Sequence, residues 1–83
     1  MRITLKLYAS LGRYLPSGAV RHAAPVDVPD DASANWVIDR FGVPREEAHL
    51  VLVNGLYVDR DRRDRNGLRD GDTLAIWPPV AGG

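Results

Sequence analysis

The 83-residue sequence contains no cysteine and a single lysine, Lys6, beside ten arginines. Without cysteine the chain can form no disulfide, offers no thiolate nucleophile and cannot hold a Cys-ligated metal. One lysine leaves few options for modification at lysine. Thiol and persulfide chemistry on a side chain of this sequence is therefore excluded.

An excess of charge of one sign and a long apolar run are also absent. Eleven basic and eleven acidic residues give a net charge of zero, so no overall field attracts nucleic acid or anionic lipid. No apolar stretch approaches 18 residues, and the N-terminus lacks the features of a signal peptide. We expect a soluble, cytoplasmic protein that folds as one domain, because 83 residues are enough for a modest core.

The first third of the chain predicts two strands. Residues 2–8 alternate apolar and polar side chains, which is typical of a half-buried strand. Residues 10–18 contain two glycines and a proline and predict a loop. Residues 20–28 predict a second strand, which Pro25 places at an edge of the sheet.

A helix is predicted to follow. Asp31 or Ser33 can accept hydrogen bonds from its first N–H groups, and Gly42 followed by Pro44 ends it near residue 41. The apolar residues recur at the spacing of one buried helical face: Ala34, Val37, Ile38 and Phe41. So short a helix is unstable alone and has to pack on a sheet.

The last third predicts three more strands and two turns. Residues 50–53 are continuously apolar, which is typical of a strand buried on both faces. Asn54-Gly55 predicts a hairpin that returns through residues 56–58. Residues 59–67 alternate Asp and Arg and predict a solvated loop. Residues 73–77 form the last strand, which Pro78 and Pro79 end.

This order of elements predicts an α+β fold, a mixed sheet with one helix packed across one face. Residues 2–8 and 73–77 are expected to be central, parallel neighbours, because a long helix-containing crossover connects them. We assign residues 1–77 to the domain and residues 78–83 to an extended tail.

The tail ends in Gly82-Gly83. Glycine has no Cβ, so such a segment can enter a narrow slot, while the two prolines keep the base of the tail extended. A stiff base, a small tip and a carboxylate at Gly83 suit presentation to another protein's active site. The alternative is an ordinary frayed terminus.

The layout resembles the β-grasp, or ubiquitin-like, fold. The residues Val53-Asn54-Gly55, then Leu68 to Asp72, then Leu74 to Gly83, resemble the MoaD/ThiS family of sulfur carriers, and the ending from Pro78 to Gly83 is most like the MoaD branch. Residues 7–12 are also similar to the family's first strand and loop. The helix, rich in leucine in the family, and the Asp/Arg-dense loop depart from the pattern.

The resemblance implies a carrier with no catalytic machinery of its own, the small sulfur-donor subunit of a molybdopterin synthase-type sulfurtransferase. A MoeB/ThiF-type, E1-like partner would use ATP to adenylate the Gly83 carboxylate, and a sulfur donor would then form the thiocarboxylate. This chain itself would bind no cofactor and no metal. Gly82 would give clearance, and a MoaE-type larger subunit would accept the sulfur. The residues expected to contact partners are Trp77, Pro78, Pro79, Val80 and Ala81.

Three alternatives remain at this stage. The chain could carry sulfur to thiazole synthesis or another biosynthetic pathway. It could be a ubiquitin-like modifier that forms isopeptide bonds through Gly83, since the same activation chemistry serves both. It could also be an interaction domain whose tail is inert.

Other residues offer weaker signals. His22 and His49 lie far apart in sequence without further ligands at metal-binding spacing, so we interpret them as ordinary surface or loop histidines. The run from Asp59 to Arg65 lacks the pattern of a calcium loop or a nucleic-acid patch, and we interpret it as a solvated loop with local ion pairs. Trp36 is expected to be partly exposed. Core packing and a role as an interface anchor both stay open for Trp77.

Overall fold

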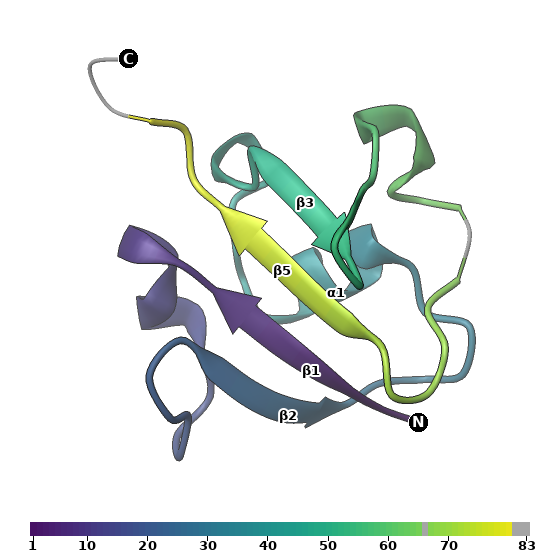
Figure 1. The fold of residues 1–83 in the computed structure, drawn as a ribbon, viewed down its shortest axis with the longest axis horizontal. Helices are drawn as coiled ribbons and strands as arrows, with labels where there is room; N and C mark the ends of the chain where they lie inside the picture. The colour runs from purple at the N-terminus through teal and green to yellow at the C-terminus, as the bar shows by residue number, and fades with distance from the viewer. Residues whose placement is uncertain (66, 81–83) are drawn as a thin grey trace.

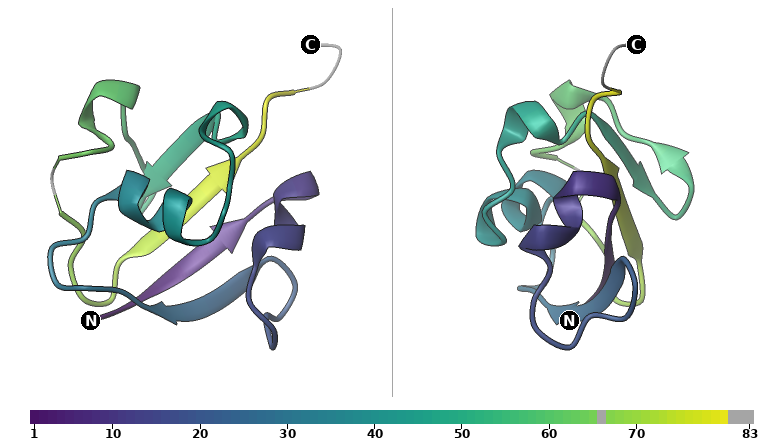
Figure 2. Two further views of the ribbon diagram at one scale, coloured as in Figure 1. Left: turned by 180° about the vertical axis from the view of Figure 1, so that it is seen from behind. Right: turned by 90° about the vertical axis from the view of Figure 1, so that its left-hand side faces the viewer.

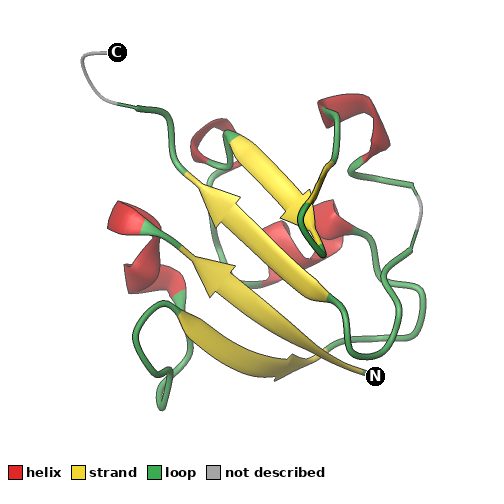
Figure 3. Cartoon of the chain, in the orientation of Figure 1, coloured by secondary structure: helices red, strands yellow, loops and turns green. Residues whose placement is uncertain are grey.

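In the described part of the chain, five strands form one mixed sheet with the helices on one of its faces (Figures 1 and 3). The computed structural model describes residues 1–65 and 67–80. The strands are β1 (Arg2–Leu7), β2 (Ala23–Asp27), β3 (Leu50–Val53), β4 (Leu56–Tyr57) and β5 (Thr73–Trp77). The main helix is α1 (Ala34–Arg40), and the short 3₁₀ helices are η1 (Ala9–Tyr14), η2 (Arg45–Glu47) and η3 (Arg60–Arg62).

Strand β5 occupies the centre of the sheet. The strand order is β2-β1-β5-β3-β4, and β5 pairs parallel with β1 and antiparallel with β3. The expected parallel pairing of the first and last strands is therefore confirmed. Strand β2 lies at one edge, which explains how the sheet accommodates Pro25.

Helix α1 follows the sequence prediction closely. The Ser33 hydroxyl accepts a hydrogen bond from the Trp36 backbone N–H at 3.0 Å, so Ser33 is the N-cap. Gly42 has a φ of 77°, the left-handed conformation that ends a helix. The inward side chains of α1 lie over β1, β5 and β3 and are completely buried at Val37 and Ile38.

Among the described residues the core cluster lies on the helix side of the sheet, so the prediction that residues 50–53 are buried on both faces was wrong. Val51 is buried, whereas Leu50 and Leu52 are half-buried on the opposite face. Figure 2 shows the reason, since α1 and η1 lie on the same side of the sheet. The continuous apolar run therefore carries a second, outward-facing set of leucines.

The predicted 10–18 loop contains a 3₁₀ helix, η1 (Figure 3). Leu11 anchors this helix in the core with no exposed surface. This segment is too short for its pattern of polar and apolar residues to indicate a helix of about two turns.

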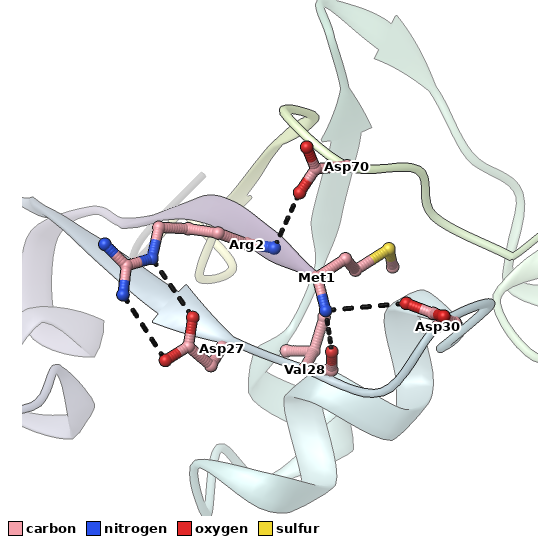
Figure 4. A network of polar contacts seen from close by, with 6 residues as sticks. All are labelled: Met1, Arg2, Asp27, Val28, Asp30 and Asp70. Carbon is pink, nitrogen blue, oxygen red and sulfur yellow. Dashed lines mark hydrogen bonds and ion pairs between the residues drawn. The ribbon is translucent and has the colours of Figure 1, made fainter.

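A network of polar contacts fixes the N-terminal end of β1 (Figure 4). The Met1 amino group donates to the Val28 carbonyl at 2.8 Å and lies 3.5 Å from the Asp30 carboxylate. The Arg2 N–H donates to Asp70 Oδ1 at 2.8 Å, and the Gly71 N–H donates to the Arg2 carbonyl at 2.8 Å. These bonds tie the turn before β5 to β1 and so set where β5 begins.

Arg63 corrects the interpretation of residues 59–67 as a solvated loop with local ion pairs. Its side chain is only 3% exposed. Its guanidinium donates to the carbonyls of Ala48 at 2.6 Å, His49 at 3.0 Å and Val58 at 3.4 Å. Burial lowers the pKa of Arg63, and the neighbouring Arg60 charge adds to this. No ion pair joins two residues within 59–65. Besides the Arg63 side chain, Asn35 holds this segment, since its side chain donates to Asp64 Oδ1 at 3.0 Å and its N–H donates to the Arg63 carbonyl at 2.9 Å.

Gly67 is required for a steric reason, and we expect Gly67→Ala to destabilise the fold. A Cβ on Gly67 would lie 2.6 Å from the Asp31 carbonyl oxygen, a backbone atom that cannot easily move. Overpacking of this kind costs about 1–3 kcal/mol. Chemical denaturation measures the loss in the free energy of unfolding.

Gly12→Ala is the matched control, because a Cβ on Gly12 meets nothing closer than 3.9 Å. Fewer unfolded conformations should make this variant neutral or more stable by up to about 1 kcal/mol. Equal losses in both variants would contradict the steric explanation.

No helix in the described residues is long and apolar enough to span a membrane.

Candidate functional site

The candidate site begins where β5 leaves the sheet. The Trp77 carbonyl accepts a hydrogen bond from the His49 N–H at 3.0 Å, and the Ile76 carbonyl accepts one from the Tyr8 N–H at 3.1 Å. The last residues of β5 are thus held by segments on both sides. After Trp77 the chain turns away from the sheet, as Figure 1 shows, and Pro79 and Val80 are exposed.

An aromatic stack holds the side chain at the end of β5. The rings of Trp77 and Tyr8 are nearly parallel, with centroids 4.1 Å apart and an interplanar angle of 4°. The His22 ring stacks on Tyr8 with centroids 4.3 Å apart. Such stacking adds about 0.5–1.5 kcal/mol per pair beyond area burial, so the indole has a defined position.

The sheet face opposite the helices is apolar around this stack. Strand alternation and register place Leu50, Leu52 and Ala75 on the same face as Trp77. Tyr57, which is 58% exposed, pairs with Leu52 and extends the face toward the β4 edge. We call this surface, made of Tyr8, Leu50, Leu52, Tyr57, Ala75 and Trp77, the open face.

Charge lies at the other end of the same side of the sheet. Arg2 Nε donates to Asp27 Oδ1 at 3.0 Å across β1 and β2. This hydrogen bond and the Arg2 charge lower the pKa of Asp27. Lys6 of β1 pairs with Ala75 and so places a positive charge beside the apolar open face, and the Arg2–Asp27 ion pair lies farther from the tail.

The structure places the predicted site residues only as far as Val80. Trp77 and Pro78 are half-buried, and Pro79 and Val80 are exposed. Ala81, Gly82 and Gly83 lie outside the described residues, so their predicted roles stay predictions. The Trp77 indole packs on Tyr8 through one face and keeps an exposed portion, so it is only partly a packing residue, and its role as an interface anchor stays a prediction.

Two site residues were missed from the sequence. Tyr8 is not among the residues predicted to contact partners, and His22 was interpreted as an ordinary surface or loop histidine. The parallel pairing of Leu7 with Ile76 puts Tyr8 beside Trp77, so the strand register was the signal for the first contact. No sequence signal indicated His22, because it reaches Tyr8 from the turn that precedes β2.

In residues 1–65 and 67–80, no three His, Asp or Glu side chains gather in a group that could hold a metal ion.

The chain is similar to known proteins over most of its length. The family model described as Mut7-C ubiquitin matches residues 1–81. A relative from Drosophila sechellia, named molybdopterin synthase sulfur carrier subunit, is 38% identical over 63 residues, which are 70% of this chain and 69% of that protein.

Solved structures share the fold. The solution structure of the Haloferax volcanii HVO 2177 protein has a TM-score of 0.76 at 26% identity and covers 100% of this chain and 87% of that one. The H. volcanii small archaeal modifier protein 1 has a TM-score of 0.66 at 27% identity, and the match covers 95% of this chain and 98% of that one. Subunits 1 and 2 of the Helicobacter pylori molybdopterin-converting factor were solved as a complex. One chain of that complex has a TM-score of 0.58 at 16% identity, and the match covers 100% of this chain and 100% of that one.

These likenesses agree with the sheet order, the single main helix and the central β5 described above. The fold is the ubiquitin-like β-grasp that the sequence resemblance implied. The chain belongs to the Mut7-C ubiquitin family, among the ubiquitin-like sulfur carriers of the MoaD/ThiS type.

Proposed function

We propose that this chain is a sulfur carrier whose Gly83 carboxyl group becomes a thiocarboxylate and donates its sulfur in molybdopterin synthesis. The similarity to proteins named molybdopterin synthase sulfur carrier subunit carries this proposal. The absence of cysteine supports it, because sulfur cannot then travel on a side-chain thiol or persulfide.

The proposed chemistry takes place in a partner, because a carboxylate is a poor electrophile. A carboxylate oxygen of Gly83 attacks the α-phosphorus of ATP in an E1-like enzyme of the MoeB/ThiF type, and pyrophosphate leaves. Hydrosulfide from a sulfur donor then attacks the carboxyl carbon, the bond from that carbon to the AMP oxygen breaks so that AMP leaves, and the thiocarboxylate remains. Activation splits one difficult transfer into two easier steps. Residues 78–83 would enter the partner's site, with Gly82 providing clearance.

We propose that these partners bind to the open face. It joins the base of the tail, since Trp77 belongs to both, and its half-buried aliphatic and aromatic side chains suit an apolar interface core. The two H. pylori subunits form a complex, and we propose that this chain likewise binds a larger MoaE-type subunit.

Trp77→Ala is expected to weaken partner binding by tenfold or more, because a buried interface Trp commonly contributes about 2 kcal/mol or more. Titration against the larger subunit measures the dissociation constant. Trp36→Ala is the matched control, since Trp36 is 38% exposed on α1, on the helix side of the sheet. Equal weakening by both substitutions would contradict docking on the open face.

Intact mass of the protein from its native host tests the sulfur chemistry. Replacement of one oxygen by sulfur, localised to Gly83 by fragmentation, is the expected result. An unchanged mass under sulfur-replete and sulfur-limited growth would overturn the proposal.

A second candidate function is protein modification, favoured by the similarity to small archaeal modifier protein 1. In that case Gly83 would form an isopeptide bond with a lysine of a target protein. Branched peptides that carry Gly82-Gly83 on target lysines would support it. If such branched peptides were absent and the thiocarboxylate mass were found, the result would support the sulfur carrier and exclude the modifier.

A further inference from the structure

A cavity lies on the helix side of the sheet, between the β3–β4 hairpin, the start of α1 and the segment after η3. Its volume is about 250 Å³. Apolar side chains line its interior, among them Val53, Val58 and Leu68. Small-molecule sites usually measure about 300–1,000 Å³, so this cavity suits one side chain of a peptide better than a cofactor.

Two arginines stand at the rim of the cavity. Arg62 and Arg65 both line it and are both exposed. The Arg65 N–H donates to the Arg62 carbonyl at 3.0 Å, so they are one turn apart and lie on the same side of the segment. The ion pairs found in residues 1–65 and 67–80 involve neither guanidinium.

The acidic residue in the cavity wall is already bound within the chain. Asp72 Oδ1 accepts a hydrogen bond from Asn54 Nδ2 at 2.9 Å, and Asp72 Oδ2 accepts one from the Arg69 N–H at 2.8 Å. Both carboxylate oxygens of Asp72 are thus hydrogen-bonded within the chain, while the two rim arginines are exposed to solvent. The Asp31 carboxylate lies against Gly67 of the lining, so the attraction for an anionic group comes from the rim formed by the two arginines.

Exposed apolar side chains continue the cavity at the β4 edge. Leu56 is 73% exposed and lies on the helix side with its partner Val53, while Tyr57 borders the cavity from the open face, to which its pairing with Leu52 assigns its side chain. Exposed apolar residues beside a hollow are typical of protein-binding surfaces. The cavity thus combines an apolar interior, an apolar lip and a cationic rim.

We infer that this cavity is a second docking site, which binds a partner's peptide segment carrying an apolar side chain next to a carboxylate. The apolar side chain fills the space between Val53, Val58 and Leu68, and the carboxylate pairs with Arg62 and Arg65. The cavity opens on the helix side near the start of β5, whereas the tail leaves from the end of that strand. A partner bound here leaves Trp77 and the tail free for an active site.

Backbone amide shifts of the full chain, titrated with a capped pentapeptide that has one leucine between two glutamates, test this inference. We expect shifts at Leu56, Val58 and Leu68, and weaker binding at high salt. The double variant Arg62→Gln with Arg65→Gln should bind about tenfold more weakly, through loss of two charge-assisted contacts. Arg13→Gln with Arg21→Gln removes the same charge far from the cavity and should bind normally.

Two control peptides separate the parts of the inference. Replacing both glutamates by glutamine should weaken binding as much as the double variant does, and replacing the leucine by alanine should abolish the shifts at Leu68. Unchanged binding of either control peptide would overturn the inference, as would shifts confined to Tyr8 and Trp77. None of these results depends on thiocarboxylate chemistry.

Discussion

Deletion of Gly82 and Gly83 is expected to abolish formation of the acyl-adenylate and of the thiocarboxylate while the fold stays intact. The new terminus, Ala81, would be two residues short of the partner's reacting atoms, and each residue of extended chain spans roughly 3.3–3.6 Å. The fold should survive because the buried core runs from Ile3 to Ile76. Intact mass after incubation with the activating enzyme, ATP and a sulfur donor measures the product.

Gly82→Ala provides the matched comparison, because it keeps the length of the tail and its carboxylate while adding one Cβ. It should be activated more slowly than the natural chain but faster than the deletion variant. Thermal unfolding at the same temperature in all three proteins would exclude a folding defect. A deletion variant that is still adenylated would disprove the assignment of chemistry to Gly83.

Arg63→Met is expected to produce the largest loss of stability, about 2–4 kcal/mol, because the buried Ala48 carbonyl would lose its donor at a cost of roughly 1–3 kcal/mol and the part-buried His49 carbonyl would lose its donor as well. The substitution keeps the length of the apolar stem but removes the donors to Ala48 and His49. Those carbonyls directly precede β3, so both segments should loosen together. Urea denaturation measures the free energy of unfolding.

Arg62→Met is the control for Arg63→Met. It removes the same charge one residue away, from an exposed side chain, and should change stability by less than about 0.5 kcal/mol. Similar losses in the two variants would show that net charge in this segment, and not the buried hydrogen bonds, determines stability.

Most of the fold could be predicted because local signals and the global arrangement agree. The Ser33 cap, Gly42 and the spacing of Val37 and Ile38 each indicate the same helix. Asn54 and Gly55 both have positive φ, 51° and 83°, as a two-residue hairpin turn requires. The central parallel pairing followed from the length of the crossover and needed no residue-level signal.

The errors share a physical cause, which is that tertiary contacts decide what surrounds a side chain. The apolar sequence of residues 50–53 is compatible with a strand buried on one face of the sheet and with a strand buried on both faces. The Asp/Arg pattern does not distinguish Arg63 from its neighbours, since burial there is set by carbonyls 14 and 15 residues earlier. In the site, Trp77 was identified, but its contacts with Tyr8 depend on register between strands far apart in sequence.

The position of β5 between β1 and β3 has a mechanical consequence. A partner that draws the tail into a deep site exerts a pulling load along β5. This strand is hydrogen-bonded to β1 on one side and to β3 on the other, so the load acts in shear and is shared by two rows of hydrogen bonds. A strand at the edge of the sheet would instead be peeled away one hydrogen bond at a time. Under the proposed function, a partner could thus hold the domain by its tail without unravelling it from the end that is pulled.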